Sequence, residues 1–557
     1  MRYNHAELFA GIAAALPERD CIVFRERRLT YRDVAERVNR LANMLLFHGI
    51  TSHRPRAALQ PWESGQDHVA LYLHNGNEYL EGMLGAAAAR ATSFNVNYRY
   101  VEAELTYLLN DASPRAIIYH ARFAPTLAAV LGSLREPPTL LLQVADDSGH
   151  ALLPGALDYE DALATCSAET PSTTPDADDL YLLYTGGTTG MPKGVMWKQA
   201  EILQSGLGGF LPDGMFDVPT LDQGVALVAE AERSVVLPLP PLMHGAAQWM
   251  ALAGLLGGGT VVFPDVVDRL DAASIWQLID REGVQRMNLV GNAFATPLCD
   301  EFERGGHSGK TLQLIGVGGA VTSASVKDRI LRLLPQVVIA DVAGSSETGS
   351  QLTNVSTSHS PATSGVFMPA AGTCVVAEDH SRVLEPGDPE TGWLAREGNI
   401  PLGYLNDRDK TECTFPTVEG RRMSLPGDRA RHRADGAIEL LGRDSVTINS
   451  GGEKIFAEEV EDALIVHPSV RDVVVVGRPS DRWGSEIVAV VELVAGLNPT
   501  DEELLSDAGQ RLARYKLPKA IVRVDAVVRS PAGKADYRWA RELAAAAQTP
   551  AQKELIK

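Results

Sequence analysis

The sequence predicts an α/β protein with two domains, because short apolar runs typical of buried strands alternate with helical stretches along most of its 557 residues. From about residue 443 this pattern gives way to a compact unit with its own strands and helices. A chain of this length exceeds what one hydrophobic core can serve. We therefore expect a large N-terminal domain over residues 1–442 and a smaller C-terminal α+β domain over residues 443–557.

The chain begins with a predicted helix. Asn4 and Glu7 have the spacing of a capping box, and Leu8, Ile12 and Leu16 then fall on one helical face. The same stretch imitates the apolar core of a signal peptide, but the helical pattern is the better interpretation.

Buried strands are indicated next by runs rich in β-branched and aromatic residues. Each run is followed by a helical stretch or by a glycine-rich loop, which is the arrangement of mostly parallel sheets with helices on their faces. The runs lie at residues 69–73, 116–120, 180–185, 233–239, 259–263 and 335–342.

The C-terminal unit starts with a helix near residue 457 that has acidic residues in its first turn, where the helix dipole favours them. The strand-like runs VVVVG and EIVAVVELV follow. Thr500 and Glu503 form a second capping-box pair, which predicts a helix running toward Arg514.

Composition excludes several classes of function. The formal net charge of −20 disfavours non-specific binding to nucleic acid or anionic lipid. The five cysteines form no CxxC pair, which argues against disulfides and zinc and for a reducing cytosol. The longest apolar run, 245–263, is broken by Gln248 and several glycines, so we expect no transmembrane segment and a cytoplasmic location.

The loop YTGGTTGMPKG at residues 184–194 follows a predicted strand. It fits neither the Walker pattern, since Pro192 precedes Lys193 and Gly194 follows it, nor a dinucleotide GxGxxG pattern. Glycine-rich backbone can still turn N–H groups toward phosphate oxygens, with threonine hydroxyls and one lysine as further donors. Phosphate binding and a plain surface hairpin both remain open for the loop alone.

Two more glycine-containing loops follow predicted strands. GVGGAV at 316–321 lets backbone approach a flat ligand, although a tight turn explains it equally well. GSSETG at 344–349 places Glu347 among small hydroxyl residues, which suits Mg²⁺ held by one carboxylate together with substrate phosphates. A solvated loop glutamate is the alternative.

Three later side chains have chemistry that suits a nucleotide. Asp428 can accept from ribose hydroxyls and Arg443 can clamp oxygens, while turn and surface ion-pair roles are the alternatives. Lys534 stands on the glycine-containing loop SPAGKADY and by itself indicates nothing.

Taken together and in order, these stretches resemble the adenylate-forming superfamily, which includes acyl-CoA synthetases, peptide-synthetase adenylation domains and luciferases. The resemblance covers nearly the whole chain, and the segment at 94–109 is similar to the fatty-acid and sterol-acid ligases of the superfamily. It implies a smaller β subdomain within the large domain, and a mobile C-terminal domain with a hinge near 443–446. The motifs are YTGGTTGMPKG, PLMHG, GVGGA, GSSETG, PGD, GRDSVTINSGGEKIFAEEVE and SPAGKAD.

The resemblance implies ATP, Mg²⁺ and coenzyme A as the small-molecule partners of a carboxylic acid. It implies that Lys534 bridges the carboxylate and the α-phosphate. Glu347 and Thr188 would form the metal site, and Asp428 and Arg443 would contact the ribose. It places His244 between the acyl pocket and the thiol channel, with a core histidine as the alternative. The other implied nucleotide-binding residues are Thr185, Gly186, Gly187, Thr189, Gly190, Lys193, Gly318, Gly319, Ala320, Gly344, Ser345 and Ser346.

In such enzymes the C-terminal domain rotates between two half-reactions, and Gly451 and Gly452 would then line the pantetheine tunnel. The chain departs from the superfamily pattern at three places. Gly186 stands where serine is usual, Ala343 where an aromatic residue stacks on adenine, and Ser445, preceded by Asp444, at the usual hinge residue.

The acid is expected to be an apolar monocarboxylate, a fatty acid or a sterol or terpenoid side-chain acid. Gly245 stands where amino-acid-activating relatives have aspartate, and an unpaired second charge would be costly to bury. The pocket residues implied by the resemblance are uncharged: Gln248, Trp249, Gly291, Asn292 and Phe294.

Three alternatives remain. The acyl group can pass to the phosphopantetheine of a carrier protein, the acid can be aromatic, or the chain can be a silent binding protein. The joint presence of Lys193, Glu347, Asp428, Arg443 and Lys534 argues against the last. We expect no binding to nucleic acid, and a homodimer is possible.

Overall fold

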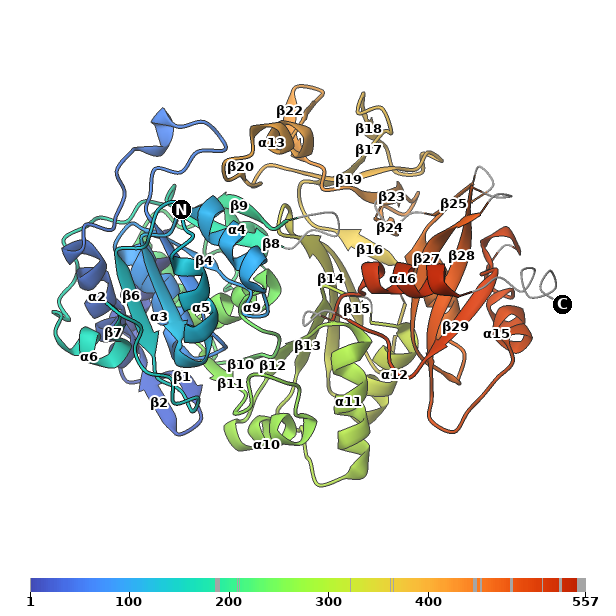
Figure 1. Cartoon of the computed structure of the whole chain (residues 1–557), viewed down its shortest axis with the longest axis horizontal. Helices are drawn as coiled ribbons and strands as arrows, with labels where there is room; N and C mark the ends of the chain where they lie inside the picture. The colour runs from blue at the N-terminus through green and yellow to red at the C-terminus, as the bar shows by residue number, and fades with distance from the viewer. Residues whose placement is uncertain are drawn as a thin grey trace.

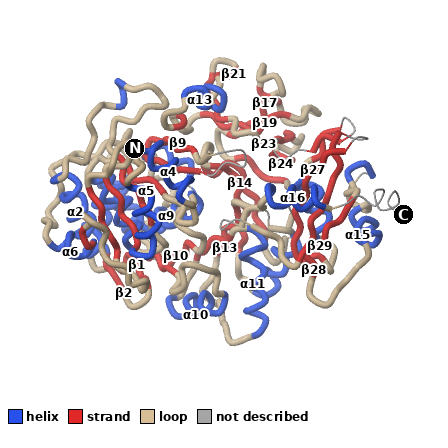
Figure 2. Tube along the Cα trace, in the orientation of Figure 1, coloured by secondary structure: helices blue, strands red, loops and turns tan. Residues whose placement is uncertain are grey.

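The computed structural model describes residues 2–185, 191–207, 209, 211–320, 322–360, 362–363, 365–443, 448–450, 453–480, 484–512, 514–529 and 533–547. Two large sheets and a smaller β region build the N-terminal part, and the C-terminal elements lie beside the β14–β15 region (Figure 1). Helices cover the strand layers (Figure 2).

The first sheet is wholly parallel, in the order β4-β3-β5-β6-β7. Both faces are buried, because Leu71 and Ile118 pack into a core with α2 and α3, whereas Ala70 and Ile117 pack into a second core with α4 and α5. Its elements are β3 (His68–Tyr72), β4 (Thr92–Asn95), β5 (Ala116–His120), β6 (Leu140–Val144), β7 (Leu157–Asp158), α2 (Tyr31–Phe47), α3 (Asn77–Ala88), α4 (Glu102–Ala112), α5 (Ala124–Leu131) and α6 (Tyr159–Ala164), with 3-10 turns at Arg56–Ala58 and Ala121–Phe123.

The second sheet has a parallel half in the order β14-β13-β12-β10-β11-β1, and β2 pairs antiparallel with β1 at its edge. One face packs on α10, α11 and α12, and the opposite side meets α1 and α9. These elements are α1 (His5–Ala15), β1 (Asp20–Phe24), β2 (Arg27–Thr30), α8 (Leu221–Glu230), β10 (Val235–Pro238), α9 (Gly245–Leu256), β11 (Thr260–Phe263), α10 (Ala272–Glu282), β12 (Arg286–Leu289), α11 (Gly291–Arg304), β13 (Leu314–Gly318), α12 (Ala324–Leu333) and β14 (Val338–Ser345).

Antiparallel strands continue this sheet beyond β14 and form the smaller β region. They are β15 (Gly349–Ser356), β16 (Val366–Pro369), β17 (Thr373–Val376), β18 (Val383–Leu384), β19 (Gly392–Glu397), β21 (Thr417–Val418), β22 (Arg421–Ser424), β23 (Asp428–His432) and β24 (Ile438–Arg443), with α13 (Arg408–Thr414) nearby. A separate three-stranded antiparallel sheet has the order β20-β9-β8. Its strands are β8 (Leu180–Thr185), β9 (Lys193–Lys198) and β20 (Gly403–Tyr404), and β9 is followed by α7 (Gln199–Ile202) and a π-helix (Leu203–Leu207).

The C-terminal domain is built on the sheet β27-β28-β29 with α14 and α15 packed on one face and α16 on the other. Its elements are β25 (Ile448–Ser450), β26 (Glu453–Ile455), α14 (Ala457–Ile465), β27 (Val470–Ser480), β28 (Gly484–Leu493), α15 (Asp501–Ala508), a 3-10 turn (Arg514–Lys516), β29 (Ala520–Val524) and α16 (Tyr537–Ala546).

The sequence located most elements closely. Strands β5 and β8 have the predicted bounds, and the capping box of Thr500 and Glu503 is formed. The helix it opens ends earlier than predicted, at Ala508. None of the helices among the described residues is long and apolar enough to cross a bilayer.

The predicted capping box at the N-terminus is wrong. Asn4 is the N-cap of α1, but its side-chain oxygen accepts from the Ala6 backbone N–H, and Glu7 does not reciprocate. Asn4 is buried, and its amide donates to the Asp176 carbonyl 172 residues away, so tertiary packing fixes its side chain.

Candidate active site

A cavity of about 290 Å³ lies at the carboxyl ends of the parallel strands β10, β12, β13 and β14. Crevices outside the carboxyl ends of parallel strands are the usual ligand sites of open α/β sheets. The end of β8, the start of α9 and the turn between β14 and β15 close its sides. Of the residues predicted from the sequence, it is lined by Thr185, His244, Trp249, Gly318, Gly319, Gly344, Ser345, Ser346 and Lys534.

Lys534 enters this cavity from the C-terminal domain. The preceding residue, Gly533, has φ of +70°, and a side-chain carbon there would stand 2.7 Å from the carbonyl oxygen of Val290. Only glycine allows this close approach of the two domains without strain. The structure therefore brings together Lys534 and the large domain's loops, which are far apart in the sequence.

His244 is the N-cap of α9, and its side chain is a neutral imidazole in this setting. Burial, together with the positive charges of Lys534 and Arg99, lowers the pKa of His244 to about 3. Its Nε2 is buried and has no hydrogen-bond partner among the described residues. A histidine of the ordinary packed core would have its polar atoms paired, so this ring nitrogen is available to a ligand in the cavity.

Glu347 and Lys193 both neighbour Tyr404, beside the cavity. The Glu347 Oε1 accepts a hydrogen bond of 2.8 Å from the hydroxyl of Tyr404. The Lys193 Nζ lies 5.6 Å from the centre of the Tyr404 ring and 3.5 Å from Oδ2 of Asp407. The predicted metal-binding carboxylate and the predicted phosphate-binding lysine are thus joined through one tyrosine.

Asp428 and Arg443 lie opposite each other on the neighbouring strands β23 and β24. The backbones of the two residues that were predicted to contact the ribose are therefore neighbours across the two strands. The register shifts at a bulge between Arg429 and Ala430. Asp428 is not among the residues that line the cavity described above.

Several predicted residues lie elsewhere. Gln248 is buried, accepts from the Tyr181 hydroxyl and donates to the Leu242 carbonyl, so it faces the core behind the cavity. Asn292 accepts from the backbone N–H of Ser323, and Phe294 packs into the core of the second sheet. Asn292 and Phe294 belong to helix α11, which starts at Gly291, and their recorded contacts are with Ser323 and the sheet core. Gly291 and Ala320 are also absent from the cavity lining.

Some predicted positions lie outside the described residues. They are Gly186, Gly187, Thr188, Thr189 and Gly190 of the glycine-rich loop, Asp444 and Ser445 of the hinge, and Gly451 and Gly452.

The cavity also has walls that the sequence reasoning missed. Two of them are asparagines at or next to the carboxyl end of a strand. Asn95 ends β4, where its side chain donates to the carbonyls of Tyr184 and Met243, and Asn288 is the second-last residue of β12. A polar residue at the end of a buried strand was the available signal. The remaining walls are mostly apolar or glycine: Met243, Ala246, Met250, Val290, Gly316 and Val317.

Trp249 forms one wall, against two glycines. A side-chain carbon on Gly206, in the π-helix, would stand 3.2 Å from the Trp249 ring, and one on Gly245 would stand 3.5 Å from it. The indole therefore occupies space that side chains at these positions would otherwise fill. Ala343, where a stacking aromatic residue was expected, packs instead into the core of the β region, and the aromatic residues lining the cavity are Tyr100, Tyr184 and Trp249.

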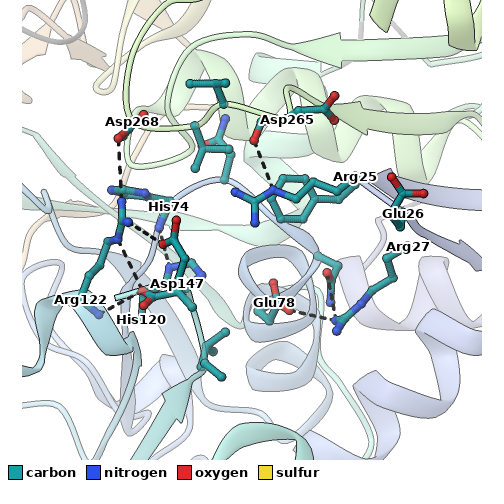
Figure 3. Close-up of a pocket in the computed structure, with 18 of the residues that line it drawn as sticks. Arg25, Glu26, Arg27, His74, Glu78, His120, Arg122, Asp147, Asp265 and Asp268 are labelled. Carbon is teal, nitrogen blue, oxygen red and sulfur yellow. Dashed lines mark hydrogen bonds and ion pairs between the residues drawn. The ribbon is translucent and has the colours of Figure 1, made fainter. Parts of the chain in front are cut away.

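A second, larger cavity of about 490 Å³ lies outside the carboxyl ends of β3, β5 and β6 (Figure 3). Arg122 turns toward Asp147 and Asp268, at 2.8 Å and 4.0 Å, and Arg27 contacts Glu78 at 3.0 Å. Two histidines border it, His74 and His120, and burial lowers their pKa values to about 4 and about 3. Its charged side chains thus largely neutralise one another.

Comparison with known families covers most of the chain. The family described as AMP-binding enzyme matches residues 9–405, and the family described as AMP-binding enzyme C-terminal domain matches residues 459–534.

Similar proteins share the whole length. The medium-chain acyl-CoA ligase Mig of Mycobacterium avium is 52% identical over 96% of this chain and 97% of its own. The 3-oxocholest-4-en-26-oate–CoA ligase of Rhodococcus rhodochrous is 39% identical over 97% of this chain and 96% of its own. Among solved structures, the anthranilate–CoA ligase AuaEII in complex with anthranoyl-AMP superposes with a TM-score of 0.81 at 21% identity over 98% of both chains, which establishes the fold.

Proposed function

We propose that this chain, which belongs to the family of AMP-binding enzymes and is an AMP-forming acid–CoA ligase, activates an apolar monocarboxylic acid. One observation carries the proposal: Lys534 is the only charged residue among the described residues that line the cavity. A single cation suits a single carboxylate beside a phosphate, and a second charge on the acid would be buried without a partner.

We assign the acid to the fatty acids or the sterol side-chain acids. Similarity to the medium-chain acyl-CoA ligase and to the 3-oxocholestenoate ligase supports both classes. The apolar walls at Met243, Met250 and Val317 suit a hydrocarbon body, whose transfer from water is favourable by about 0.8 kcal/mol for each methylene buried.

In the first half-reaction a carboxylate oxygen attacks the α-phosphorus of ATP, and the bond to the bridging oxygen breaks as pyrophosphate leaves. Two anions must approach each other, so neutralising their charge is the main requirement. Lys534 is the residue we assign to this role, because its side chain reaches the cavity in the present domain arrangement. His244, held neutral, can donate or accept one hydrogen bond there without adding charge.

In the second half-reaction the thiol sulfur of coenzyme A attacks the acyl carbonyl carbon, and the carbon–oxygen bond to AMP breaks. Lys534 lines the cavity in the present arrangement, and the thiol must also reach the acyl carbon there. We therefore propose that the C-terminal domain, which we bound at 443–557 with its hinge near 443–446, rotates before this step. The rotation would withdraw Lys534 and bring the glycine pair Gly451–Gly452 to the cavity.

The residues present fit a magnesium ion. Glu347 offers a carboxylate, a hard oxygen ligand, and shares Tyr404 as a neighbour with Lys193. No cluster of three or more metal-binding side chains occurs within the described ranges. Mg²⁺ typically binds through one or two carboxylates and the phosphates of its substrate. Glu347 and Thr188 would hold the ion, which neutralises phosphate charge when bound.

The test is pyrophosphate release from MgATP with a panel of acids, in the presence and absence of coenzyme A. The panel comprises short, medium and long fatty acids, sterol side-chain acids, aromatic acids and amino acids. We expect release that depends on a fatty or sterol side-chain acid and turns over repeatedly only with coenzyme A.

Two results would redirect the proposal. Release that coenzyme A fails to accelerate would indicate a carrier-protein acceptor, and preference for an aromatic acid would replace the proposed substrate class. If no acid in the panel supports pyrophosphate release, the chain would instead be a catalytically silent binding protein.

A further inference from the structure

Tyr404 touches both of the groups that would meet the nucleotide phosphates. Its hydroxyl donates to Oε1 of Glu347 at 2.8 Å, and its ring lies under the Lys193 ammonium, with Nζ 5.6 Å from the ring centre. Glu347 belongs to the turn between β14 and β15, whereas Lys193 begins β9. One side chain therefore spans two separate elements of the site.

Tyr404 is itself held firmly. It is buried, and its strand β20 pairs antiparallel with β9, placing Tyr404 opposite Val195. Its backbone N–H donates to the Thr411 hydroxyl at 2.9 Å, and the next residue, Leu405, donates to the Gly194 carbonyl at 2.8 Å. The ring position is thus fixed to the strand that starts with Lys193.

The backbone around Glu347 is also fixed from several sides. Its carbonyl accepts from the Ser424 hydroxyl at 2.7 Å, its N–H donates to the Ser345 hydroxyl at 3.2 Å, and the neighbouring Ser346 carbonyl accepts from the Trp197 indole at 2.8 Å. With the backbone fixed, the remaining freedom of Glu347 is the rotation of its side chain. The Tyr404 hydroxyl restrains that rotation through one carboxylate oxygen.

We infer that Tyr404 is a positioning residue, which aims the Glu347 carboxylate at the metal-bearing phosphates while its ring keeps the Lys193 ammonium beside them. The inference rests on the proposed function. A charge-assisted hydrogen bond from a tyrosine is short and directional, so it orders a carboxylate without neutralising it. A carboxylate aimed in advance loses less conformational freedom when it takes up a cation.

The variant Tyr404→Phe separates the two contacts, since it deletes the hydroxyl and keeps the ring under Lys193. The measurement is the equilibrium binding of Mn²⁺, used as a probe for Mg²⁺, to the complex of the enzyme with α,β-methylene ATP. Binding is monitored by the decrease of the electron paramagnetic resonance signal of free Mn²⁺. We expect the Mn²⁺ dissociation constant to rise about three- to tenfold, which is the range expected for the loss of one typical hydrogen bond. Binding of the analogue in EDTA should not change.

The matched control is Tyr119→Phe, which removes a buried hydroxyl that donates to Gln143 on the first sheet. It should bind Mn²⁺ like the unmodified enzyme. The same Tyr404→Phe change in a Glu347→Gln background should have no further effect, because the carboxylate it aims is gone.

Two outcomes overturn the inference: unchanged Mn²⁺ affinity in Tyr404→Phe, or an equal loss in the Glu347→Gln background. Neither outcome would contradict the proposed function. That function would be contradicted if the unmodified enzyme bound no nucleotide analogue.

Discussion

The two cavities of the N-terminal domain have the same topological origin and opposite chemistry. In the first sheet the chain runs from β3 outward to β4 and then to β5 on the other side, and the larger cavity lies at this switch point. In the second sheet β10 is followed by β11 on one side and β12 on the other, and the smaller cavity lies there. Both positions are ones where open parallel sheets bind ligands.

The difference lies in how many charged side chains line each cavity. In the larger cavity Arg122 is shared among Asp146, Asp147 and Asp268, so its charge is satisfied within the protein. In the smaller one the lining contributes a single charged group, Lys534, supplied by another domain. The volume of a cavity therefore does not show which of the two is the candidate reaction site. The distinguishing feature is a single charged side chain in an otherwise uncharged lining.

The largest expected effect is on Lys534. Lys534→Ala should lower acid-dependent pyrophosphate release about 10²- to 10³-fold, the usual loss when one preorganised donor to developing charge is removed. Thioester formation from supplied acyl-adenylate should be largely retained. The control is Lys519→Ala, another exposed lysine of the C-terminal domain, which should behave like the unmodified enzyme. Equal loss in both half-reactions would contradict the two-arrangement account.

The next effect concerns the wall at Trp249. Trp249→Ala should move the acid preference toward longer or bulkier acids, with kcat/KM rising about fourfold for each extra methylene that the enlarged cavity buries. Gly206→Ala should do the reverse, because its new carbon would press on the indole at 3.2 Å and push it inward. The measurement is kcat/KM over a series of saturated acids. A shift in the same direction for both variants would exclude Trp249 as the limiting wall.

A smaller effect is expected from replacing Arg122 in the larger cavity. Arg122→Ala should leave pyrophosphate release within about twofold of the unmodified enzyme and reduce the free energy of unfolding by about 1 kcal/mol or less, since its partner Asp147 is exposed. Steady-state kinetics and thermal unfolding check both statements. A marked rise in the KM for coenzyme A would contradict this contrast between the two cavities, because the larger cavity would then take part in the second half-reaction.

The smallest effect is that of pH on His244. With a pKa of about 3, the ring stays neutral between pH 5 and 9, so it should add no inflection to the pH profile of pyrophosphate release. The lowered pKa means that the proton is lost well below the ordinary value of 6.5 and is not regained in this range. Profiles of the unmodified enzyme and His244→Gln should therefore run parallel. An inflection near pH 6.5 that disappears in the variant would show that the ring titrates normally.

Much of the fold followed from local sequence. The runs at 116–120 and 180–185 became β5 and β8 without change, because an apolar β-branched run flanked by turn residues has few other ways to bury itself. Thr500 and Glu503 formed their capping box, since its partners lie three residues apart and need no distant contact. Asn4 failed to do so because a distant carbonyl, that of Asp176, holds its side chain.

The sequence by itself determined the order of the motifs, and with them the family and the absence of a second charge at Gly245. The tertiary structure decided which residues meet. Lys534 reaches the cavity that His244 also lines only because a glycine turn docks against Val290. Tyr404 joins Lys193 to Glu347 only because β20 pairs with β9 across more than 200 residues. Local propensity acts over a few residues, whereas such contacts depend on sheet register and domain docking, which no single stretch of sequence specifies.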